Sequence, residues 1–113
     1  MKKIETYIRP DKFQDVQMAL EAIGSPGMTV SDVRGHGVQK CVTQEWKGEK
    51  IKVSLLPKIR IETVVKDESV AKVVETILEA AQTGEAGDGK IFVTPIEQVY
   101  RVRTKESGEK ALS

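Results

Sequence analysis

The stretch Ile4-Glu5-Thr6-Tyr7-Ile8 decides the fold of this chain, because its pattern returns 57 positions later, from 4 to 61, as Ile61-Glu62-Thr63-Val64-Val65. The match continues beyond these stretches, where apolar residues again align with apolar residues under the same shift. The further aligned pairs are Phe13 with Val70, Val16 with Val73, and Leu20 with Ile77. The sequence therefore predicts two copies of one structural unit.

Each copy opens with a predicted strand and continues with a predicted helix. Alternating or β-branched residues over 4–8 and 59–65 indicate strands, in which side chains two apart share a face. Apolar residues then recur at the spacing of a helix in both copies. The two predicted helical stripes are Phe13, Val16, Leu20 and Ile23, and Val70, Val73, Val74, Ile77 and Ala81.

The ends of these helices carry recognisable signals. Asp11 with Gln14 resembles a capping box, and Asp67 is the expected cap of the second helix. Gly24 supplies a left-handed stop after the first helix. Both helices are thus bounded by residues that favour a start or an end.

Glycine-containing turns are expected to lead from the helices into further strands over 28–33 and 91–94, and a last strand is predicted over 99–103. The economical assembly is an α+β, ferredoxin-like βαββαβ sandwich, in which both helices cover one face of an antiparallel sheet. The other face then needs a cover. A trimer packed around a common axis would supply one, and the residues alone would equally permit a dimer.

Composition limits what the chain can do. A length of 113 residues suits a single domain, and 18 Lys plus Arg nearly balance 17 Asp plus Glu. The balanced charge gives no basic surface for nucleic acid, and two Phe, two Tyr and one Trp are too few for a base-stacking surface. Nucleic acid is therefore not an expected partner.

No apolar run is long enough for a membrane span, and the charged start does not resemble a signal peptide, which predicts a cytoplasmic protein. A lone cysteine, Cys41, argues against a disulfide or a structural zinc site.

Glycines gather at 35–37 and at 84–90. The second cluster spells G-x-x-x-x-G-K, but Ile91 stands where a Walker loop needs Ser or Thr, so it is not that motif. Taken alone, such a cluster is more often a tight turn than a phosphate cradle. Nearby cationic side chains favour the second interpretation, a site for an anion such as a nucleotide phosphate. These cations are Lys58, Lys90, Arg101 and Arg103, the last two sharing a strand face if 99–103 is a strand.

Several of these segments together resemble the PII nitrogen-regulatory family, over residues 1 to about 112. The most specific segment is the run from 87 to 93. The segments that carry the resemblance are Met1-Lys2-Lys3-Ile4-Glu5, Gly27-Met28-Thr29-Val30, Gln39-Lys40, Leu56-Pro57-Lys58, Thr83-Gly84, Gly87-Asp88-Gly89-Lys90-Ile91-Phe92-Val93 and Arg101-Val102-Arg103-Thr104.

The resemblance implies a homotrimer of single-domain subunits, residues 1–113, with nucleotide sites in the clefts between subunits. It also implies a long mobile loop over 38–55, called the T-loop, and a C-terminal tail over 104–113. Each nucleotide site would hold ATP or ADP. The implied nucleotide-binding residues are Thr29, Gly35, Gly37, Val38, Gln39, Glu62, Thr63, Val64, Gly87, Asp88, Gly89, Lys90, Arg101 and Arg103.

Further ligands follow from the same resemblance. In the presence of ATP, 2-oxoglutarate would bind through Gln39, Lys40 and Lys58, and Gln39 would also contact Mg²⁺. The set of bound ligands would select the conformation of the T-loop and hence the target that it docks on, such as an ammonium transporter. The protein would then reach a membrane only through that transporter.

The T-loop departs from the usual family pattern. Ile51 and Glu49 stand where many members carry a uridylylated tyrosine and cyanobacterial members a phosphorylated serine, so neither modification can occur there. Lys47 stands where family members that plug ammonium transporters carry an arginine, and lysine cannot form the planar two-point contact that an arginine makes. Trp46 is a candidate interface anchor, and an indole folded onto its own subunit is an equal alternative. Trp46, Lys47 and Ile51 are the predicted partner-binding residues.

Other functions stay open at this point. Val38 and Lys50 alter the loop's charge, which suits a divergent module that binds nucleotides but regulates another transporter or pathway. A metal-binding structural trimer or a small hydrolase is a third alternative. Cys41 and His36 lie five apart with no third group to orient them, so no catalytic residue is predicted.

Overall fold

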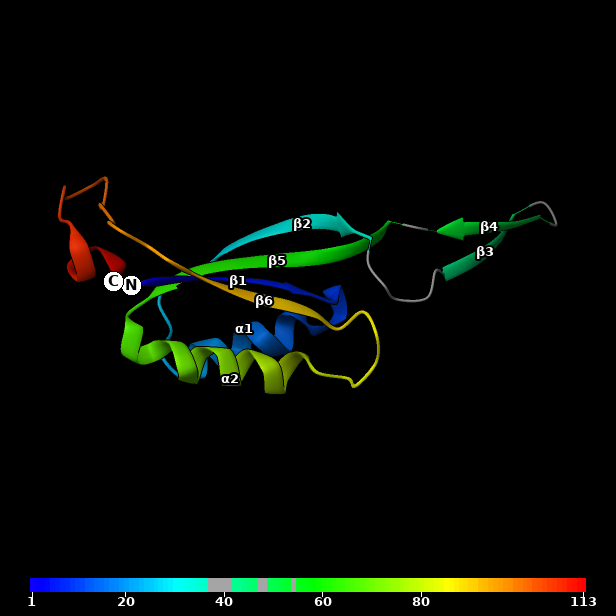
Figure 1. Cartoon of the computed structure of the whole chain (residues 1–113), viewed down its shortest axis with the longest axis horizontal. Helices are drawn as coiled ribbons and strands as arrows, with labels where there is room; N and C mark the ends of the chain where they lie inside the picture. Colours follow the sequence, from blue (N-terminus) through cyan, green and yellow to red (C-terminus); the bar gives the residue numbers. More distant parts are fainter. Residues whose placement is uncertain (37–41, 47–48, 54) are drawn as a thin grey trace.

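The computed structural model of the chain describes residues 1–36, 42–46, 49–53 and 55–113. Its main sheet has four antiparallel strands in the order β2-β5-β1-β6. Two helices pack together against one face of this sheet (Figure 1). The strands are β1 (Lys2–Ile8), β2 (Thr29–Gly35), β5 (Leu56–Val65) and β6 (Gly89–Pro95), and the helices are α1 (Phe13–Ala22) and α2 (Val70–Ala81). The predicted ferredoxin-like βαββαβ sandwich is confirmed.

The two copies of the repeat pair with each other at the centre of the sheet. Strand β1 lies antiparallel to β5 with Ile4 opposite Thr63, Glu5 opposite Glu62, and Thr6 opposite Ile61. The equivalent triplets 4–6 and 61–63 therefore run antiparallel to each other. A local two-fold axis between Glu5 and Glu62 relates one triplet to the other. The duplication detected in the sequence is a local two-fold symmetry of the fold.

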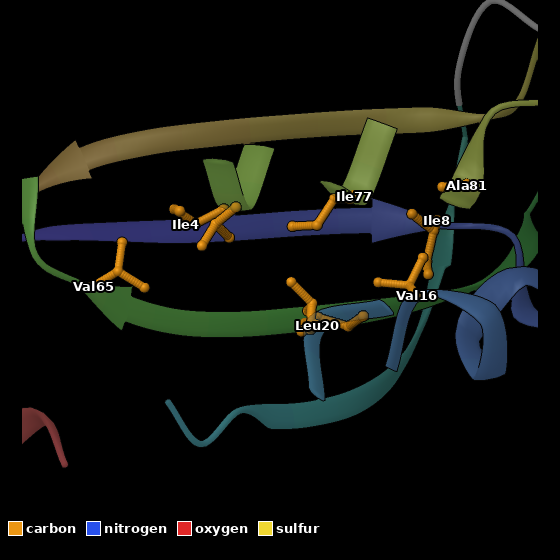
Figure 2. Packing of buried hydrophobic residues seen from close by; sticks show 9 residues of the cluster. Ile4, Ile8, Val16, Leu20, Val65, Ile77 and Ala81 are labelled. Carbon is orange, nitrogen blue, oxygen red and sulfur yellow. The ribbon is translucent and has the colours of Figure 1, made fainter. Parts of the chain in front are cut away.

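The core lies between the sheet and the two helices. From β1, Ile4 and Ile8 are buried together with Thr6, whereas the alternate side chains point to the other face. Figure 2 shows these isoleucines meeting side chains of both helices. The buried apolar residues are Ile4, Ile8, Val16, Leu20, Ile61, Val65, Val73, Ile77 and Ala81. The predicted helical stripes supply five of these residues, as the periodicity required.

The helix starts differ from the predicted caps. Short 3₁₀ turns, η1 (Pro10–Lys12) and η2 (Asp67–Ser69), precede the helices, and no side chain caps either helix. Asp67 instead accepts a hydrogen bond from the N-terminal amine of Met1 at 2.8 Å. The capping box at Asp11 and the cap at Asp67 were therefore wrong, because the 3₁₀ turns already satisfy the first amides of each helix. Gly24, with φ +71°, ends α1 as predicted.

The predicted last strand over 99–103 was also wrong. Strand β6 already pairs with β1 from Ile8 to Lys2, and Ile96 N donates to Met1 O at 3.1 Å where β1 begins. Beyond that point β1 offers no further residue to pair with, and the chain folds back on itself through a bridge between Tyr100 and Ser107. It then ends in a short helical turn, η3 (Gly108–Leu112).

The predicted long connection between the two copies contains two short strands. Strands β3 (Val42–Trp46) and β4 (Glu49–Val53) pair antiparallel with each other and form a separate two-stranded sheet. No helix in the described part of the chain has the length and apolar character needed to cross a membrane.

Candidate functional site

The glycine loop between α2 and β6 is organised around one carboxylate. Asp88 accepts hydrogen bonds from Thr83 N at 2.8 Å, Thr83 Oγ1 at 2.5 Å and Gly84 N at 2.9 Å. These contacts close residues 83–88 into a compact turn. Hydrogen bonds from Thr83, followed by that from Arg9, hold the pKa of Asp88 far below its usual range, so the loop carries a fixed negative charge at its base.

Glycine is required at the end of this loop. Gly89 has φ +108°, and a Cβ at this position would lie 1.6 Å from the carbonyl oxygen of Tyr7. The loop can therefore approach β1 closely only because position 89 has no side chain. This close approach sets the point at which β6 begins to pair with β1.

Arg9, just after β1, fixes the loop from outside. Its Nε donates to Asp88 Oδ1 at 2.9 Å, and its Nη2 donates to the carbonyl oxygen of Ala86 at 2.7 Å. No sequence pattern indicated Arg9, since nothing local links position 9 with positions 86 and 88. The guanidinium joins the first copy of the repeat to the loop of the second.

Lys58 of β5 approaches the same loop from the sheet. Its Nζ donates to the carbonyl oxygen of Gly87 at 2.5 Å. Partial burial, and then the positive charge of Arg9, lower the pKa of Lys58 below its ordinary value. Both effects disfavour the charged ammonium form of Lys58. An anionic ligand near Nζ would stabilise this charged form, and the attraction would favour binding of the ligand.

Lys58, Gly87 and Gly89 border a hollow of about 690 Å³ on the helix-free side of the sheet, whereas Arg9 and Asp88 are not part of its lining. This volume lies within the range of small-molecule sites. The lining given by the described residues contains Lys and Arg side chains and no Asp or Glu, which suits an anion. Tyr7 and Phe92 form its apolar wall, with ring centroids 6.0 Å apart in an edge-to-face contact. The lining residues are Tyr7, Val33, Arg34, Gly35, His36, Lys58, Arg60, Ala86, Gly87, Gly89, Lys90 and Phe92.

Four predicted nucleotide residues gather instead in a second hollow of about 270 Å³: Thr29, Glu62, Thr63 and Val64. Thr29 lies opposite Glu62 in the register of β2 and β5. The remaining walls come from the chain termini and the α1–β2 connection. They are Lys3, Pro26, Gly27, Val99, Ala111 and Leu112.

Arg101 and Arg103 lie at the opposite end of the sheet from the glycine loop. Strand β6 starts at Gly89 beside Ile8 and ends at Pro95 beside Lys2, a span of about 20 Å at roughly 3.4 Å per residue. The segment that follows β6 and carries both arginines continues beyond that end, on the side of the sheet where both chain termini lie (Figure 1). Within one chain they cannot share a phosphate with Lys90. The expectation that they share a strand face was wrong, because Val102 and its neighbours form a turn.

Five predicted site residues lie outside the described part of the chain: Gly37, Val38, Gln39, Lys40 and Lys47. Trp46 and Ile51 belong to β3 and β4, whose backbone pairing is described and whose side chains are not. Among the described residues, no group of three His, Cys, Asp or Glu side chains could hold a metal ion. The implied Mg²⁺ contact at Gln39 thus stays a prediction.

Comparison with known proteins gives a consistent set of relatives. The family model described as Nitrogen regulatory protein P-II matches residues 1–106. The chain is 53% identical over 112 residues to "Nitrogen regulatory protein P-II 2" of Methanothermobacter thermautotrophicus, covering 99% of this chain and 97% of that one. It is 50% identical to "Nitrogen regulatory protein P-II" of Microchaete diplosiphon, covering 99% and 100%. Among solved structures, Arabidopsis thaliana PII bound to citrate is similar, with TM-score 0.78, 46% identity, and 97% and 90% coverage.

Proposed function

Because this chain belongs to the nitrogen regulatory protein P-II family, we propose that it senses ATP, ADP and 2-oxoglutarate and regulates a nitrogen-pathway protein such as an ammonium transporter. Members of this family are regulatory signal transducers rather than enzymes, and no catalytic role is proposed for any residue here. The observation that carries the proposal is the gathering of Gly35, Lys58, Gly87, Gly89 and Lys90 around one cationic hollow.

The nucleotide site is completed by a second copy of the chain. Within one subunit, the glycine loop and the hollow of Thr29, Glu62 and Val64 do not share a lining, and Arg101 lies beyond the far end of the sheet. A neighbouring subunit that brings this far end to the glycine loop would place base, ribose and phosphate contacts around one ligand. The phosphates would then meet Lys90 from one subunit and the Arg101–Arg103 turn from the other.

The uncovered face of the sheet supports a homotrimer. Glu5 and Tyr7 of β1, Arg60 and Glu62 of β5, and Phe92 of β6 occupy this face, opposite the helices. Phe92 is 48% exposed in the single chain. Large exposed aromatic residues beside charges that can pair across an interface are typical of association surfaces. Packing three such faces around an axis would bury Phe92 and bring the half-sites together.

Lys58 is the proposed partner of a carboxylate of 2-oxoglutarate. Its ammonium lies at the edge of the hollow, partly desolvated and beside Arg9, so a bound carboxylate would restore a favourable charge balance. The structure of the Arabidopsis relative, described as bound to citrate, provides a carboxylate ligand on a protein of the same fold. Gln39 and Lys40 would add contacts, and Gln39 would reach the Mg²⁺ that ATP brings.

The ligand state would be passed on through the T-loop, residues 38–55, which leaves β2 at the rim of the hollow where Gly35 and His36 lie. Trp46, Lys47 and Ile51 are proposed to contact the target. The protein would act in the cytoplasm, with no nucleic-acid partner and with membrane contact only through a transporter.

One alternative keeps the fold and the nucleotide but changes the target. Ile51 and Glu49 exclude uridylylation and serine phosphorylation at the positions where relatives can carry them. This departure favours a divergent module that regulates another transporter or pathway without covalent modification.

Calorimetric titration tests the proposal. 2-Oxoglutarate is titrated into the purified protein with Mg-ATP and again with Mg-ADP, and binding is expected only with Mg-ATP. ATP binding without any response to 2-oxoglutarate would favour the divergent module. Absence of adenine-nucleotide binding would overturn the sensor proposal and leave the family membership and fold unchanged.

A further inference from the structure

The guanidinium of Arg101 donates hydrogen bonds to several groups in the C-terminal part of its own chain. Its Nη1 donates to Glu106 Oε1 at 2.6 Å, and its Nη2 donates to the carbonyl oxygen of Lys110 at 2.7 Å and to the main-chain oxygen of Ser113. Only 23% of the side chain is exposed. Main-chain bonds support this arrangement, since Arg101 N donates to Glu106 O at 2.8 Å.

This geometry restricts how Arg101 can bind an anion. A guanidinium binds phosphate most strongly through two parallel N–H groups. Both available pairs, Nε with Nη2 and Nη1 with Nη2, include Nη2, which donates here to two main-chain oxygens. Binding phosphate through two N–H groups therefore requires Nη2 to give up at least one of its bonds to Lys110 and Ser113. Binding through Nη1 and Nη2 also requires Nη1 to give up Glu106 or its weaker contact at 3.5 Å with Thr104 Oγ1.

The segment that holds Arg101 also lines the second hollow. Ala111 and Leu112, between the two carbonyl partners of Nη2, border this hollow together with Val99. Gly108, with φ +74°, donates its N–H to Val99 O at 2.9 Å and starts the turn η3. A movement of residues 108–113 would thus change both the arginine and the wall of the hollow.

We propose that Glu106 and residues 108–113, the C-terminal turn, compete with the phosphate of a bound nucleotide for the guanidinium of Arg101. When Arg101 binds the anion, the C-terminal turn opens. The inference rests on the proposed role of Arg101 in the nucleotide site. Binding and opening are linked reciprocally: an anion that takes Nη2 loosens the turn, and any change that loosens the turn raises anion affinity. The C-terminal turn therefore reports phosphate binding at a place far from the T-loop.

Hydrogen exchange on the full chain measures the opening directly. Amides of residues 108–113 are followed by mass spectrometry without ligand, with saturating Mg-ATP, and with inorganic triphosphate as a probe that lacks base and ribose. Exchange in this segment is expected to rise about fivefold or more with either ligand, because about 1 kcal/mol of local contacts is lost. Unchanged or slower exchange while ligand is bound, as checked by calorimetry, overturns the proposal.

Substitutions test the competition. Glu106→Gln removes the charge that holds Nη1 and is expected to raise affinity for inorganic triphosphate and Mg-ATP about three- to tenfold. The matched control is Glu109→Gln in the same segment, whose carboxylate faces Lys66 at 3.9 Å and not Arg101. Gly108→Ala, which strains the start of the turn at φ +74°, is a second loosening variant and is expected to act in the same direction.

The outcomes separate this inference from the proposed function. If triphosphate loosens the turn but neither wild type nor any variant binds ATP, the sensor proposal fails, and the competition for Arg101 stands for an inorganic anion and is overturned for a nucleotide. If ATP binds and neither Glu106→Gln nor Gly108→Ala differs from Glu109→Gln, the competitor fails and the sensor proposal stands. If neither ligand binds to any of these proteins, both are overturned.

Discussion

The guanidinium of Arg9 lies 2.9 Å from the carboxylate of Asp88, although 79 residues separate them in the chain. Arg9 follows the first strand of the first copy of the repeat, and Asp88 lies in the glycine loop of the second. The contact makes the shape of the loop depend on both copies. Since Lys58 Nζ donates to Gly87 O in the same loop, the position of the glycine loop depends on three segments of the chain.

Asp88→Asn should lower thermal stability at neutral pH and weaken nucleotide binding. The folded-state pKa of Asp88 is lowered, so the stability that it contributes is present above the ordinary aspartate pKa of about 3.9 and is lost as pH falls through the folded-state value. The difference in melting temperature between wild type and variant should therefore be largest near pH 7 and shrink toward pH 2. Asp11→Asn, an exposed carboxylate in η1, is the control. A difference that stays constant from pH 7 to 2 would contradict this role.

Lys58→Gln should weaken 2-oxoglutarate binding at least about tenfold in the presence of Mg-ATP, because a charge-assisted contact to the carboxylate is removed. Calorimetric titration measures the change. Lys66→Gln, one residue beyond the far end of β5, should behave like wild type. Equal affinities in the two variants would remove Lys58 from the proposed effector site.

Gly89→Ala should destabilise the fold by about 3 kcal/mol, since it combines a Cβ clash with Tyr7 O and a φ of +108°. Urea unfolding monitored by circular dichroism measures the loss. Gly27→Ala is the control, because a Cβ there meets open space and should change stability by at most about 0.5 kcal/mol. A fully stable Gly89→Ala protein would show that β1 and the loop can separate freely.

The two-fold symmetry of the repeat provides a matched pair of threonines. Thr63 Oγ1 donates to Gly27 O at 3.1 Å, whereas the buried Thr6 Oγ1 has no partner among the described residues. Thr63→Val should cost about 1–2 kcal/mol of unfolding free energy, because Gly27 O loses its donor. Thr6→Val should be neutral or slightly stabilising. Equal losses from both substitutions, in urea unfolding at pH 7, would mean that the two hydroxyls have the same environment.

Phe92→Asp should abolish the proposed trimer without unfolding the subunit. Phe92 is 48% exposed in the single chain and lies on the helix-free face, so its cost to the subunit core is small while a charge in the packed interface is expensive. Light scattering coupled to gel filtration should show one third of the wild-type mass. Leu78→Asp places the same charge on the exposed side of α2, where Leu78 is 53% exposed, and should leave the mass unchanged. A trimeric Phe92→Asp protein would place the interface elsewhere.

Much of the fold could be predicted from the sequence because local periodicity reports burial directly. The recurrence of Ile4-Glu5-Thr6 at 61–63 predicted two equivalent units, and the structure pairs these triplets in one register. Alternation in the strands and helical spacing at Val16, Leu20, Val73 and Ile77 identified core residues. The predicted side-chain caps at Asp11 and Asp67 were wrong, because 3₁₀ turns precede both helices and no side chain caps either one.

The site could be predicted only in part. Glycine spacing and the family resemblance pointed to 87–90, of which Gly87, Gly89 and Lys90 line a cationic hollow with Gly35 and Lys58. Their role in binding a nucleotide stays a prediction. Neither indicated Arg9, whose partners lie 77 and 79 residues away. A strand was predicted at 99–103, but a strand there needs a neighbour, and β6 already reaches the first residues of β1 at Pro95 and Ile96.

The sequence by itself determined the repeat, the strand and helix types, and the residue chemistry of the glycine loop, because these depend on side chains close together in the chain. Only the tertiary structure decided that Arg9 and Lys58 hold this loop, and that Arg101 lies at the far end of the sheet with its Nη2 already bound. The physical reason is that such contacts depend on strand order and on where each strand runs out of partners. Those properties belong to the assembled sheet, and no local pattern encodes them.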